Sequence, residues 1–349
     1  MITPAFWKHK KVLLTGHTGF KGSWLSLWLQ RMQADVVGYA LAPTTPLHLF
    51  GIADVAVGMK SIIGDIRDIT RLEELVVGLQ PDVIIHMAAQ SLVRRGYQHP
   101  VETYMTNLMG TVHVLDAVRR SNPTHPLAVL VVTSDKCYQN HHTGQAYDET
   151  DPLGGGDPYS TSKACAELVT SAYRATYLNH GIGLASVRAG NVIGGGDWAE
   201  DRLIPDLIHA HLTKTPLKLR YPEAIRPWQH VLDALSGYLC LAEALYHEPS
   251  AYAEAWNFGS DTPQSVRFIL DYIKTLGFSP LIQEQPLDAA QPEATCLVLN
   301  SDKAKTRLGW QPQWDLETAL QKTFHWYDAY AHHAPMRDVC FEQLDQYQF

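Results

Sequence analysis

Residues 15–22, Thr15-Gly16-His17-Thr18-Gly19-Phe20-Lys21-Gly22, come directly after a short apolar run at 11–14. Glycines three positions apart allow a tight turn from strand to helix, let the backbone approach a ligand closely and let the helix pack on the sheet. The N–H groups at the start of such a helix form a binding site for an anion such as a pyrophosphate. An ordinary tight turn also uses glycine, but the position after a first strand favours dinucleotide binding.

The first half of the chain alternates apolar runs of strand length with amphipathic stretches of helix length. Strands are predicted at 11–14, 35–39, 61–64, 82–87, 128–133 and 184–188. Helices are predicted at 21–30, 70–79, 101–120 and 159–179. Short, nearly continuous apolar strands separated by helices indicate a parallel sheet covered on both faces. We therefore expect an α/β fold with a Rossmann-type, doubly wound parallel sheet, and a ligand at the carboxyl ends of its strands.

The character of the sequence changes near residue 190, where glycine, proline, tryptophan and arginine become frequent. This change predicts a dinucleotide-binding domain at 1–190 and a smaller, mixed substrate domain at 191–349. A helix near 230–246 and a strand near 255–258 are expected to rejoin the first domain, so that the segments near 230–262 belong to it.

Composition excludes several classes of function. The chain has 349 residues, 46% apolar content and a net charge of −8 without a long basic run, so we expect no nucleic-acid partner. No stretch of about 20 apolar residues occurs, so no membrane association is expected and a cytoplasmic location is predicted. The seventeen histidines have no metal-ligand spacing, which predicts no metal site. The five cysteines have no metal-ligand spacing either and are expected as free thiols: Cys137, Cys165, Cys240, Cys296 and Cys340.

Residues 157–163, Asp-Pro-Tyr-Ser-Thr-Ser-Lys, predict the start of a helix with Tyr159 and Lys163 one turn apart on the same face. An ammonium group beside a phenol favours the phenolate, which would lower the pKa of Tyr159 from about 10 toward neutral. An ordinary surface Tyr–Lys pair has the same spacing. The glycine turn upstream favours a catalytic pair instead.

Three polar residues, Ser134, Asp135 and Lys136, follow the predicted strand at 128–133. This position brings Ser134 to the carboxyl end of the sheet beside Tyr159. A solvated pair in a turn is the alternative for the two ionisable residues. A simple epimerisation would need only the serine, the tyrosine and Lys163, so the two additional groups indicate further proton transfers.

These motifs carry a resemblance to a known family. The Gly-x-x-Gly-x-x-Gly spacing resembles the extended short-chain dehydrogenase/reductase family, and residues 134–136 correspond to the Thr-Asp-Glu triplet of the nucleotide-sugar 4,6-dehydratases in it. The Ser-Asp-Lys version is similar to the members that act on CDP-hexoses, as are His-Met-Ala-Ala-Gln at 86–90 and Arg-Pro-Trp-Gln-His at 226–230. The likeness extends to 188–191 and 194–198, and so covers nearly the whole chain.

The resemblance implies NAD as the cofactor and a CDP-hexose as the substrate. The second strand ends at 38–43 without the acid that usually holds the adenosine ribose and without an arginine for a 2′-phosphate, which favours NAD bound loosely. His17 is expected either to touch a phosphate or to be a simple loop residue. The implied cofactor-binding residues are Gly16, His17, Gly19, Phe20, Lys21, Gly22, Asp65, Ile66, Ala88, Ala89, Gln90, Thr133, Tyr159 and Lys163. The implied substrate-binding residues are Gln90, Asn191, Arg202, Arg220 and Arg226.

The implied reaction oxidises C4, removes water across C5 and C6, and returns hydride to C6. Tyr159 is the expected base at the 4-hydroxyl, Asp135 the acid at the 6-hydroxyl and Lys136 the base at C5, with Ser134 and Lys163 completing the catalytic set. Three alternatives remain open: a nucleotide-sugar 4-epimerase, a 4,6-dehydratase for another nucleotide hexose such as GDP-mannose, and a non-catalytic NAD-sensing protein. By resemblance, the helix at 101–120 is expected to pair in a homodimer, with a homotetramer also possible.

Overall fold

The computed structural model describes residues 2–140, 144–178, 181–219, 221–260, 262–284 and 297–347. Cys296 and Arg220 therefore lie outside the described residues. The four other cysteines are free, as predicted. Within the described ranges, no helix is both long and apolar enough to cross a membrane. The same part of the chain contains no cluster of three or more residues suited to hold a metal ion.

The centre of the molecule is a seven-stranded sheet with the order β3-β2-β1-β4-β5-β7-β12. Every neighbouring pair in it is parallel. Its strands are β1 (Lys11–Thr15), β2 (Asp35–Ala40), β3 (Lys60–Ile63), β4 (Val83–His86), β5 (Leu127–Val132), β7 (Ile182–Arg188) and β12 (Ala255–Asn257). The chain starts in β1, moves outward to β3 and then crosses back to β4, which confirms the predicted doubly wound sheet.

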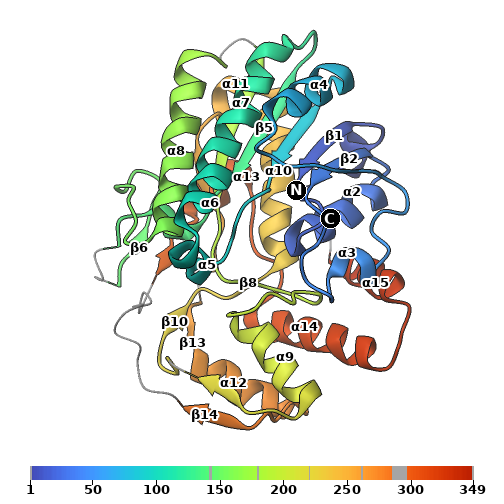
Figure 1. Cartoon of the computed structure of the whole chain (residues 1–349), viewed down its shortest axis with the longest axis vertical. Coiled ribbons are helices and arrows are strands. Elements are labelled where there is room, and N and C mark those ends of the chain that lie inside the picture. Colours follow the sequence, from blue (N-terminus) through green and yellow to red (C-terminus); the bar gives the residue numbers. More distant parts are fainter. Residues whose placement is uncertain are drawn as a thin grey trace.

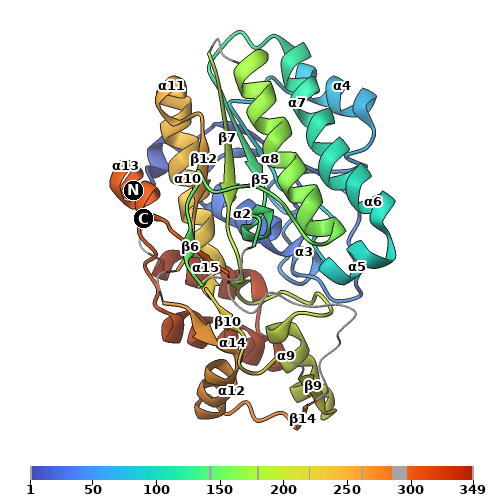
Figure 2. The same cartoon turned by 90° about the vertical axis from the view of Figure 1, so that its left-hand side faces the viewer.

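Helices cover both faces of this sheet (Figure 2), so the central strands β4, β5 and β7 are buried on both sides. One face is covered mainly by α2 (Phe20–Arg31) and α10 (Val231–His247), and its apolar core continues into the C-terminal region. The other face packs against α4 (Ile69–Leu79), α7 (Gly110–Ser121) and α8 (Pro158–Thr176). Smaller helices surround these layers: α1 (Pro4–Trp7), α3 (Leu49–Ile52), α5 (Val93–Gln98), α11 (Pro249–Tyr252), α13 (Asp302–Leu308) and α15 (Met336–Gln346).

The helix predicted at 101–120 has an irregular turn in the structure. It is built from α6 (Pro100–Tyr104), a π-helical turn η1 (Met105–Met109) and α7, which follow one another without a break. In the π turn, the Asn107 amide donates to the Gln90 carbonyl at 2.9 Å and to Ser162 Oγ at 2.9 Å. Such turns are frequent near functional sites, and this one joins the end of β4 to the start of α8.

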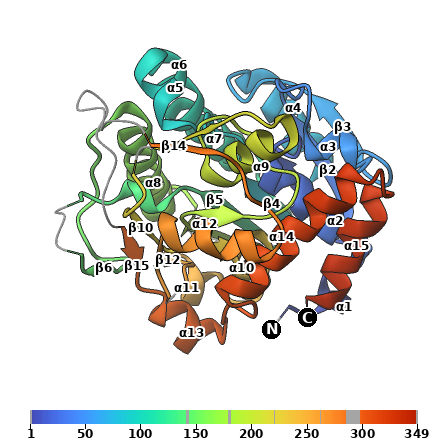
Figure 3. The ribbon, with the colours of Figure 1, turned by 90° about the horizontal axis from the view of Figure 1, so that it is seen from below.

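The second part of the chain lies below the carboxyl ends of the strands (Figures 1 and 3). It contains small two-stranded sheets and three longer helices rather than one large sheet. Its elements are β8 (Val192–Ile193), α9 (Leu203–Thr213), β9 (Leu217–Leu219), β10 (Ile225–Arg226), β11 (Gln229–His230), β13 (Gln264–Ser265), α12 (Val266–Thr275), β14 (Ile282–Glu284) and α14 (Leu316–Ala331). Two further short strands, β6 (Ala146–Tyr147) and β15 (Val298–Leu299), pair beside α8 and β12.

Two later segments lie against the first sheet. β12 pairs in parallel with β7, with Ala255 opposite Ser186, and α10 packs on β5 and β7. The segment between β7 and α10 therefore leaves the sheet and returns to it. This path places residues 189–219 and 221–230 opposite the strand ends, and many of them line a cavity.

Candidate active site

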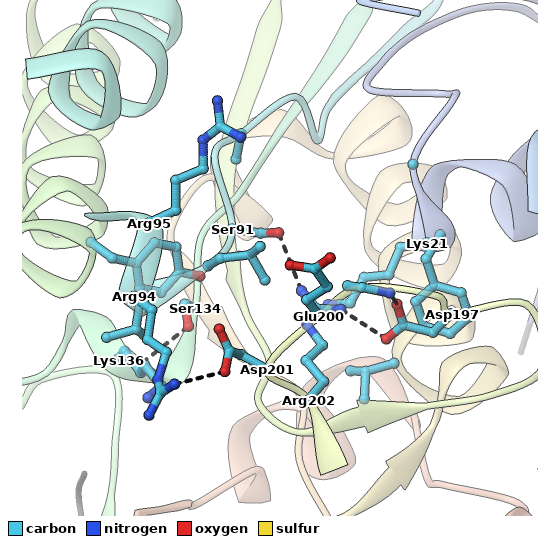
Figure 4. A pocket seen from close by; sticks show the side chains of 18 of the residues that line it. Lys21, Ser91, Arg94, Arg95, Ser134, Lys136, Asp197, Glu200, Asp201 and Arg202 are labelled. Carbon is cyan, nitrogen blue, oxygen red and sulfur yellow. Dashed lines mark hydrogen bonds and ion pairs between the residues drawn. The ribbon is translucent and has the colours of Figure 1, made fainter. Parts of the chain in front are cut away.

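A cavity of about 1540 Å³ opens at the carboxyl ends of β1, β4, β5 and β7. Its walls are the turn after β1, the start of α8, residues 189–206 and the region around β9 and β10. Figure 4 shows its polar side chains arriving from both halves of the molecule. A ligand is expected at this edge of a doubly wound sheet, because the strand order reverses between β1 and β4.

The glycine turn between β1 and α2 is built as the sequence predicts. Gly16 has φ +78°, and a Cβ there would lie 2.7 Å from the backbone nitrogen of Ala88. A Cβ on Gly22 would lie 2.1 Å from the Gly16 carbonyl oxygen. Gly19 and Phe20 at the start of α2 line the cavity, so the backbone there can approach a pyrophosphate.

His17 lies behind the turn and not in the cavity wall. Its ring is fully buried, with Nε2 2.7 Å from Ser61 Oγ, and it packs directly on Gly38 of β2. Burial lowers the pKa of His17 to about 4, so the ring is neutral at physiological pH. A phosphate contact was one of the two alternatives for His17. Its buried side chain cannot make that contact, which leaves only its main chain for the role.

Lys21 points into the cavity from the first turn of α2 (Figure 4). Its Nζ lies 3.4 Å from the hydroxyl of Tyr238 on α10. Burial, followed by repulsion from Arg202 and Lys163, lowers the pKa of Lys21 to about 8, while Asp135 opposes the shift. Lys21 therefore releases its proton more readily than a lysine in water.

The end of the cavity beside β2 and β3 is less polar. Ala42 lines it, and no acid follows β2. Asp65 and Ile66 also line it, but the Asp65 carboxylate is held by Arg67 at 2.6 Å, and hydrogen bonding to Arg67 lowers the pKa of Asp65. The carboxylate expected at the adenine edge is therefore already paired.

The segment after β4 supports the glycine turn. Of the three residues predicted there, Ala88 and Ala89 line the cavity and Gln90 does not. Thr15 Oγ1 accepts hydrogen bonds from the backbone N–H groups of Met87 and Ala88, and Ala88 and Ala89 line the cavity. Gln90 is directed elsewhere, because its amide donates to Thr103 Oγ1 at 2.9 Å and accepts from the Leu92 N–H at 2.6 Å. Its side chain does not line the cavity, so the expected contact of Gln90 with cofactor or substrate needs correction: its role here is to hold the loop.

Ser134, Asp135 and Lys136 lie where β5 ends, on a 3₁₀ turn, η2 (Asp135–Cys137). Ser134 Oγ donates to Asp135 Oδ1 at 2.9 Å and accepts from the Lys136 N–H at 3.2 Å. Burial raises the pKa of the Asp135 carboxyl, which favours its protonated form. Thr133, the last residue before this turn, also lines the cavity.

The start of α8 presents Tyr159 and Lys163 to the same cavity. The helix is capped by Asp157, whose carboxylate accepts from the Ser160 N–H at 3.0 Å. Lys163 Nζ donates to the Val132 carbonyl at 3.2 Å, and burial lowers the pKa of Lys163 to about 8.

The expected lowering of the tyrosine pKa is wrong for the protein on its own. Burial raises the pKa of the Tyr159 phenol to about 12, and the hydrogen bond with Ser134 opposes this only in part. Loss of hydration outweighs the nearby cations because the phenol is almost wholly enclosed.

The remaining predicted residues lie across the cavity. Arg202 donates to Asp197 Oδ2 at 2.9 Å and to Ser91 Oγ at 3.2 Å (Figure 4). Asn191, with φ +44°, and Arg226 of β10 also line the cavity. Arg220 lies outside the described residues.

Three further residues of this wall were not predicted. Asp197 holds Arg202, and Arg94 of α5 pairs with Asp201 at 2.9 Å across the cavity mouth. Asp197 lies in the quoted motif at 194–198, which was a usable signal. Arg94 and Asp201 carry no signal in the sequence, since their contact joins segments over 100 residues apart.

Taken together, the site has a glycine turn for an anionic cofactor, a Tyr–Lys pair on one helix, and a Ser-Asp-Lys triplet facing that pair. This combination defines a dinucleotide-dependent enzyme of the short-chain dehydrogenase/reductase type, with two ionisable groups beyond the basic set.

Comparison with known proteins agrees. A family model described as GDP-mannose 4,6 dehydratase matches residues 13–323, and the chain belongs to this family. The CDP-glucose 4,6-dehydratase of Salmonella typhimurium is 49% identical over 339 residues, which cover 95% of this chain and 94% of that protein. The predicted resemblance to the nucleotide-sugar 4,6-dehydratases is therefore confirmed.

Solved structures show the same fold. The dTDP-glucose 4,6-dehydratase of Bacillus anthracis, in complex with NAD, has a TM-score of 0.78 at 24% identity, covering 94% of this chain and 99% of that one. The UDP-glucose 4-epimerase of Brucella ovis, in complex with NAD, has a TM-score of 0.78 at 24% identity, covering 91% and 98%. Dehydratases and epimerases therefore share this architecture, and the fold alone does not separate them.

Proposed function

We propose that this protein is an NAD-dependent nucleotide-sugar 4,6-dehydratase that converts CDP-D-glucose to CDP-4-keto-6-deoxy-D-glucose and water. The observation that carries the proposal is the placement of Asp135 and Lys136 at the cavity, directly beside Ser134 and opposite Tyr159. The 49% identity to a CDP-glucose 4,6-dehydratase supports both the reaction and the nucleotide.

The residues that line the cavity suit the binding of NAD. Gly16 and Gly22 form a cradle that any Cβ would fill, and the start of α2 offers N–H groups to a pyrophosphate. Lys163, which lines the cavity, would hold the ribose of the nicotinamide half. When bound, NAD supplies a hydride acceptor that returns the hydride later in the same turnover.

The first proton transfer is assigned to Tyr159. Its phenolate takes the proton of the sugar 4-hydroxyl as the C4–H bond is oxidised, and Ser134 hydrogen-bonds the same oxygen. The Lys163 ammonium favours the phenolate by its charge.

Elimination is assigned to the other two groups. The 4-ketone acidifies the C5–H bond, and Lys136 is assigned as the base that takes that proton. Asp135, whose pKa is raised by burial, gives a proton to the departing 6-hydroxyl, which leaves as water. The product is complete when C6 has received the hydride and C5 has received a proton.

The opposite wall is proposed to bind the nucleotide diphosphate and the sugar. Arg202 and Arg226 can direct planar guanidinium groups at phosphate oxygens, and Asn191 is placed for the sugar or a phosphate. Arg220 stays a prediction for the same role. In this proposal, residues 191–349 form the substrate domain, apart from the segments near 230–262, which belong with the cofactor domain.

A homodimer is also proposed. Val101 of α6 is 75% exposed and Leu168 of α8 is 58% exposed, and these two helices pack against each other. A matching surface on a second copy would cover them. Val101→Glu combined with Leu168→Glu should yield a monomer by sedimentation, and an unchanged oligomer would refute this pairing.

The decisive test is a substrate panel. Purified protein with added NAD is incubated with CDP-, dTDP-, UDP- and GDP-hexoses, and the sugar nucleotides are analysed by mass spectrometry. Loss of one water from CDP-glucose alone is the expected result. An unchanged mass with an inverted C4 would instead identify a 4-epimerase, and water loss from GDP-mannose alone would reassign the nucleotide.

A further inference from the structure

Glu167 is a buried carboxylate directly behind the active site. It lies on α8 one turn beyond Lys163, its side chain is 2% exposed, and it does not line the cavity. Burying a carboxylate is costly unless it is paired and hydrogen-bonded, so its surroundings should explain its presence.

Three groups satisfy this carboxylate, one directly after β5 and two on β7. Thr133 Oγ1 donates to Glu167 Oε1 at 2.5 Å, while Ser186 Oγ and Arg188 Nη2 donate to Oε2 at 2.7 and 2.9 Å. Thr133 immediately precedes Ser134 at the end of β5, and the other two donors lie on β7. Glu167 therefore ties the catalytic helix to the strand end that carries the catalytic triplet.

Arg188 extends the connection to the far side of the triplet. Its other terminal nitrogen, Nη1, donates to the Tyr138 hydroxyl at 2.7 Å, and that hydroxyl donates to Asn257 Oδ1 of β12 at 2.8 Å. The guanidinium carbon also lies 4.8 Å from the centre of the Tyr138 ring. The segment 133–138 is thus held at both ends, at Thr133 by Glu167 and at Tyr138 by Arg188.

The charges around this carboxylate come from several elements. Arg188 on β7 faces it, Lys163 and Arg174 share its helix, and Cys137 approaches from η2. Attraction to Glu167 raises the pKa of Lys163 against the larger effect of burial. Lys163 also faces His86 of β4 and Lys21 of α2, and burial keeps His86 neutral.

We propose that Glu167 is a positioning residue for catalysis. Through Thr133, Ser186 and Arg188, it holds the segment 133–138 at a fixed distance from Tyr159 and Lys163. It also supplies the negative charge that keeps Lys163 in its ammonium form. This proposal deepens the function proposed above and rests on it for its kinetic consequences.

The first test is Glu167→Gln, with Asp233→Asn as the matched control. Asp233 is an equally buried carboxylate on α10 that accepts from Tyr347 and Gln313 and does not line the cavity. For Glu167→Gln, kcat with CDP-glucose should fall roughly 10²-fold with little change in KM, because the catalytic groups lose their mutual placement. The alkaline limb of the kcat profile should move to lower pH, since the ammonium form of Lys163 loses its counter-charge.

A second readout does not depend on turnover. Hydrogen exchange should show faster exchange of the amides at 134–138 in Glu167→Gln and no change there in Asp233→Asn. If Glu167→Gln matches the control in kcat, pH limb and exchange, Glu167 is only structural and the proposal is overturned. If the wild type converts no nucleotide sugar, the proposed function fails, while the exchange measurement still decides the positioning role.

Arg188→Lys separates the two effects and serves if Glu167→Gln does not fold. Lysine keeps the positive charge beside Glu167 but cannot reach Glu167 and Tyr138 together, because it lacks the planar fork. The amides at 134–138 should exchange faster and kcat should fall, while the alkaline limb stays in place. Unchanged exchange and kcat would overturn the proposal.

Discussion

Tyr159 shows how burial and reactivity conflict at a single residue. Its phenol pKa is raised to about 12 because the ring is enclosed, yet the reaction needs the phenolate. The hydrogen bond with Ser134 and the charge on Arg202 favour ionisation. The positive charge of an oxidised nicotinamide near the phenol would favour it further. The tyrosine is therefore expected to become reactive only when cofactor is bound.

Replacing Tyr159 with phenylalanine tests this role. Tyr159→Phe keeps the ring and removes the proton acceptor, so kcat with CDP-glucose should fall about 10²–10⁴-fold. Binding of NAD, measured by calorimetry, should change little because the ring still fills its place. Turnover close to wild type would remove the phenol from the mechanism.

Asp135 and Lys136 can be distinguished by where the reaction stops. In Lys136→Met, oxidation at C4 should proceed and elimination should not, so NADH absorbance should accumulate on mixing with substrate. Asp135→Asn should also slow water loss, because no proton reaches the 6-hydroxyl. Measured together by rapid-quench mass spectrometry, normal elimination in Lys136→Met would assign the C5 base elsewhere.

At the scale of elements, the turn and the strand ends decide how tightly cofactor is held. The glycine turn is closed against the end of β4, but β2 ends at the cavity without a carboxylate. The Asp65 carboxylate after β3 is already bound by Arg67. The adenosine half of a dinucleotide would therefore find few charged partners.

Ala42→Asp should restore a ribose contact at this place. Ala42 lines the cavity just after β2, and a carboxylate there can accept from both ribose hydroxyls. Hydrogen bonds to a charged group predict about tenfold tighter NAD binding by calorimetry. Val77→Asp on the exposed side of α4 adds the same charge away from the site and is the control. Equal NAD affinity in wild type and Ala42→Asp would contradict the prediction.

The regularity of one helix differs from the sequence-based prediction. The helix predicted at 101–120 contains the π turn at 105–109, whose buried residue is the polar Asn107. Amphipathic periodicity does not reveal this turn. The cause lies in contacts with Gln90 and Ser162, which are distant in sequence.

At the scale of the whole molecule, the C-terminal helix is fastened to α10 by a buried carboxylate. Asp233 accepts from the Tyr347 hydroxyl at 2.8 Å and the Gln313 N–H at 2.7 Å. Burial raises the pKa of Asp233 to about 6, against partial opposition from these hydrogen bonds. A carboxyl with a raised folded pKa stabilises the fold below its unfolded pKa and loses that contribution as pH rises through the folded value.

This contribution is measurable by difference. From pH 4 to above 6, wild type should lose about 3 kcal/mol of unfolding free energy relative to Asp233→Asn, since two pKa units correspond to that amount. Because the asparagine cannot ionise, the pH dependence of the difference in unfolding free energy between the two proteins reports the titration of Asp233. Denaturant titrations at several pH values provide the measurement. A difference that is independent of pH would show that Asp233 is not neutralised by folding.

The sequence alone determined the sheet, the glycine turn and the pairing of Tyr159 with Lys163, because each depends on local spacing: strand and helix periodicity, or residues one helical turn apart. The resemblance carried by its motifs gave the family. Tertiary structure alone decided where the side chains point. It turned His17 and Gln90 away from the cavity, occupied Asp65 with Arg67, and raised rather than lowered the pKa of Tyr159. Contacts such as Glu167–Arg188 and Arg94–Asp201 join segments far apart in the chain. Burial and long-range contact depend on how the whole chain packs, so no local pattern records them.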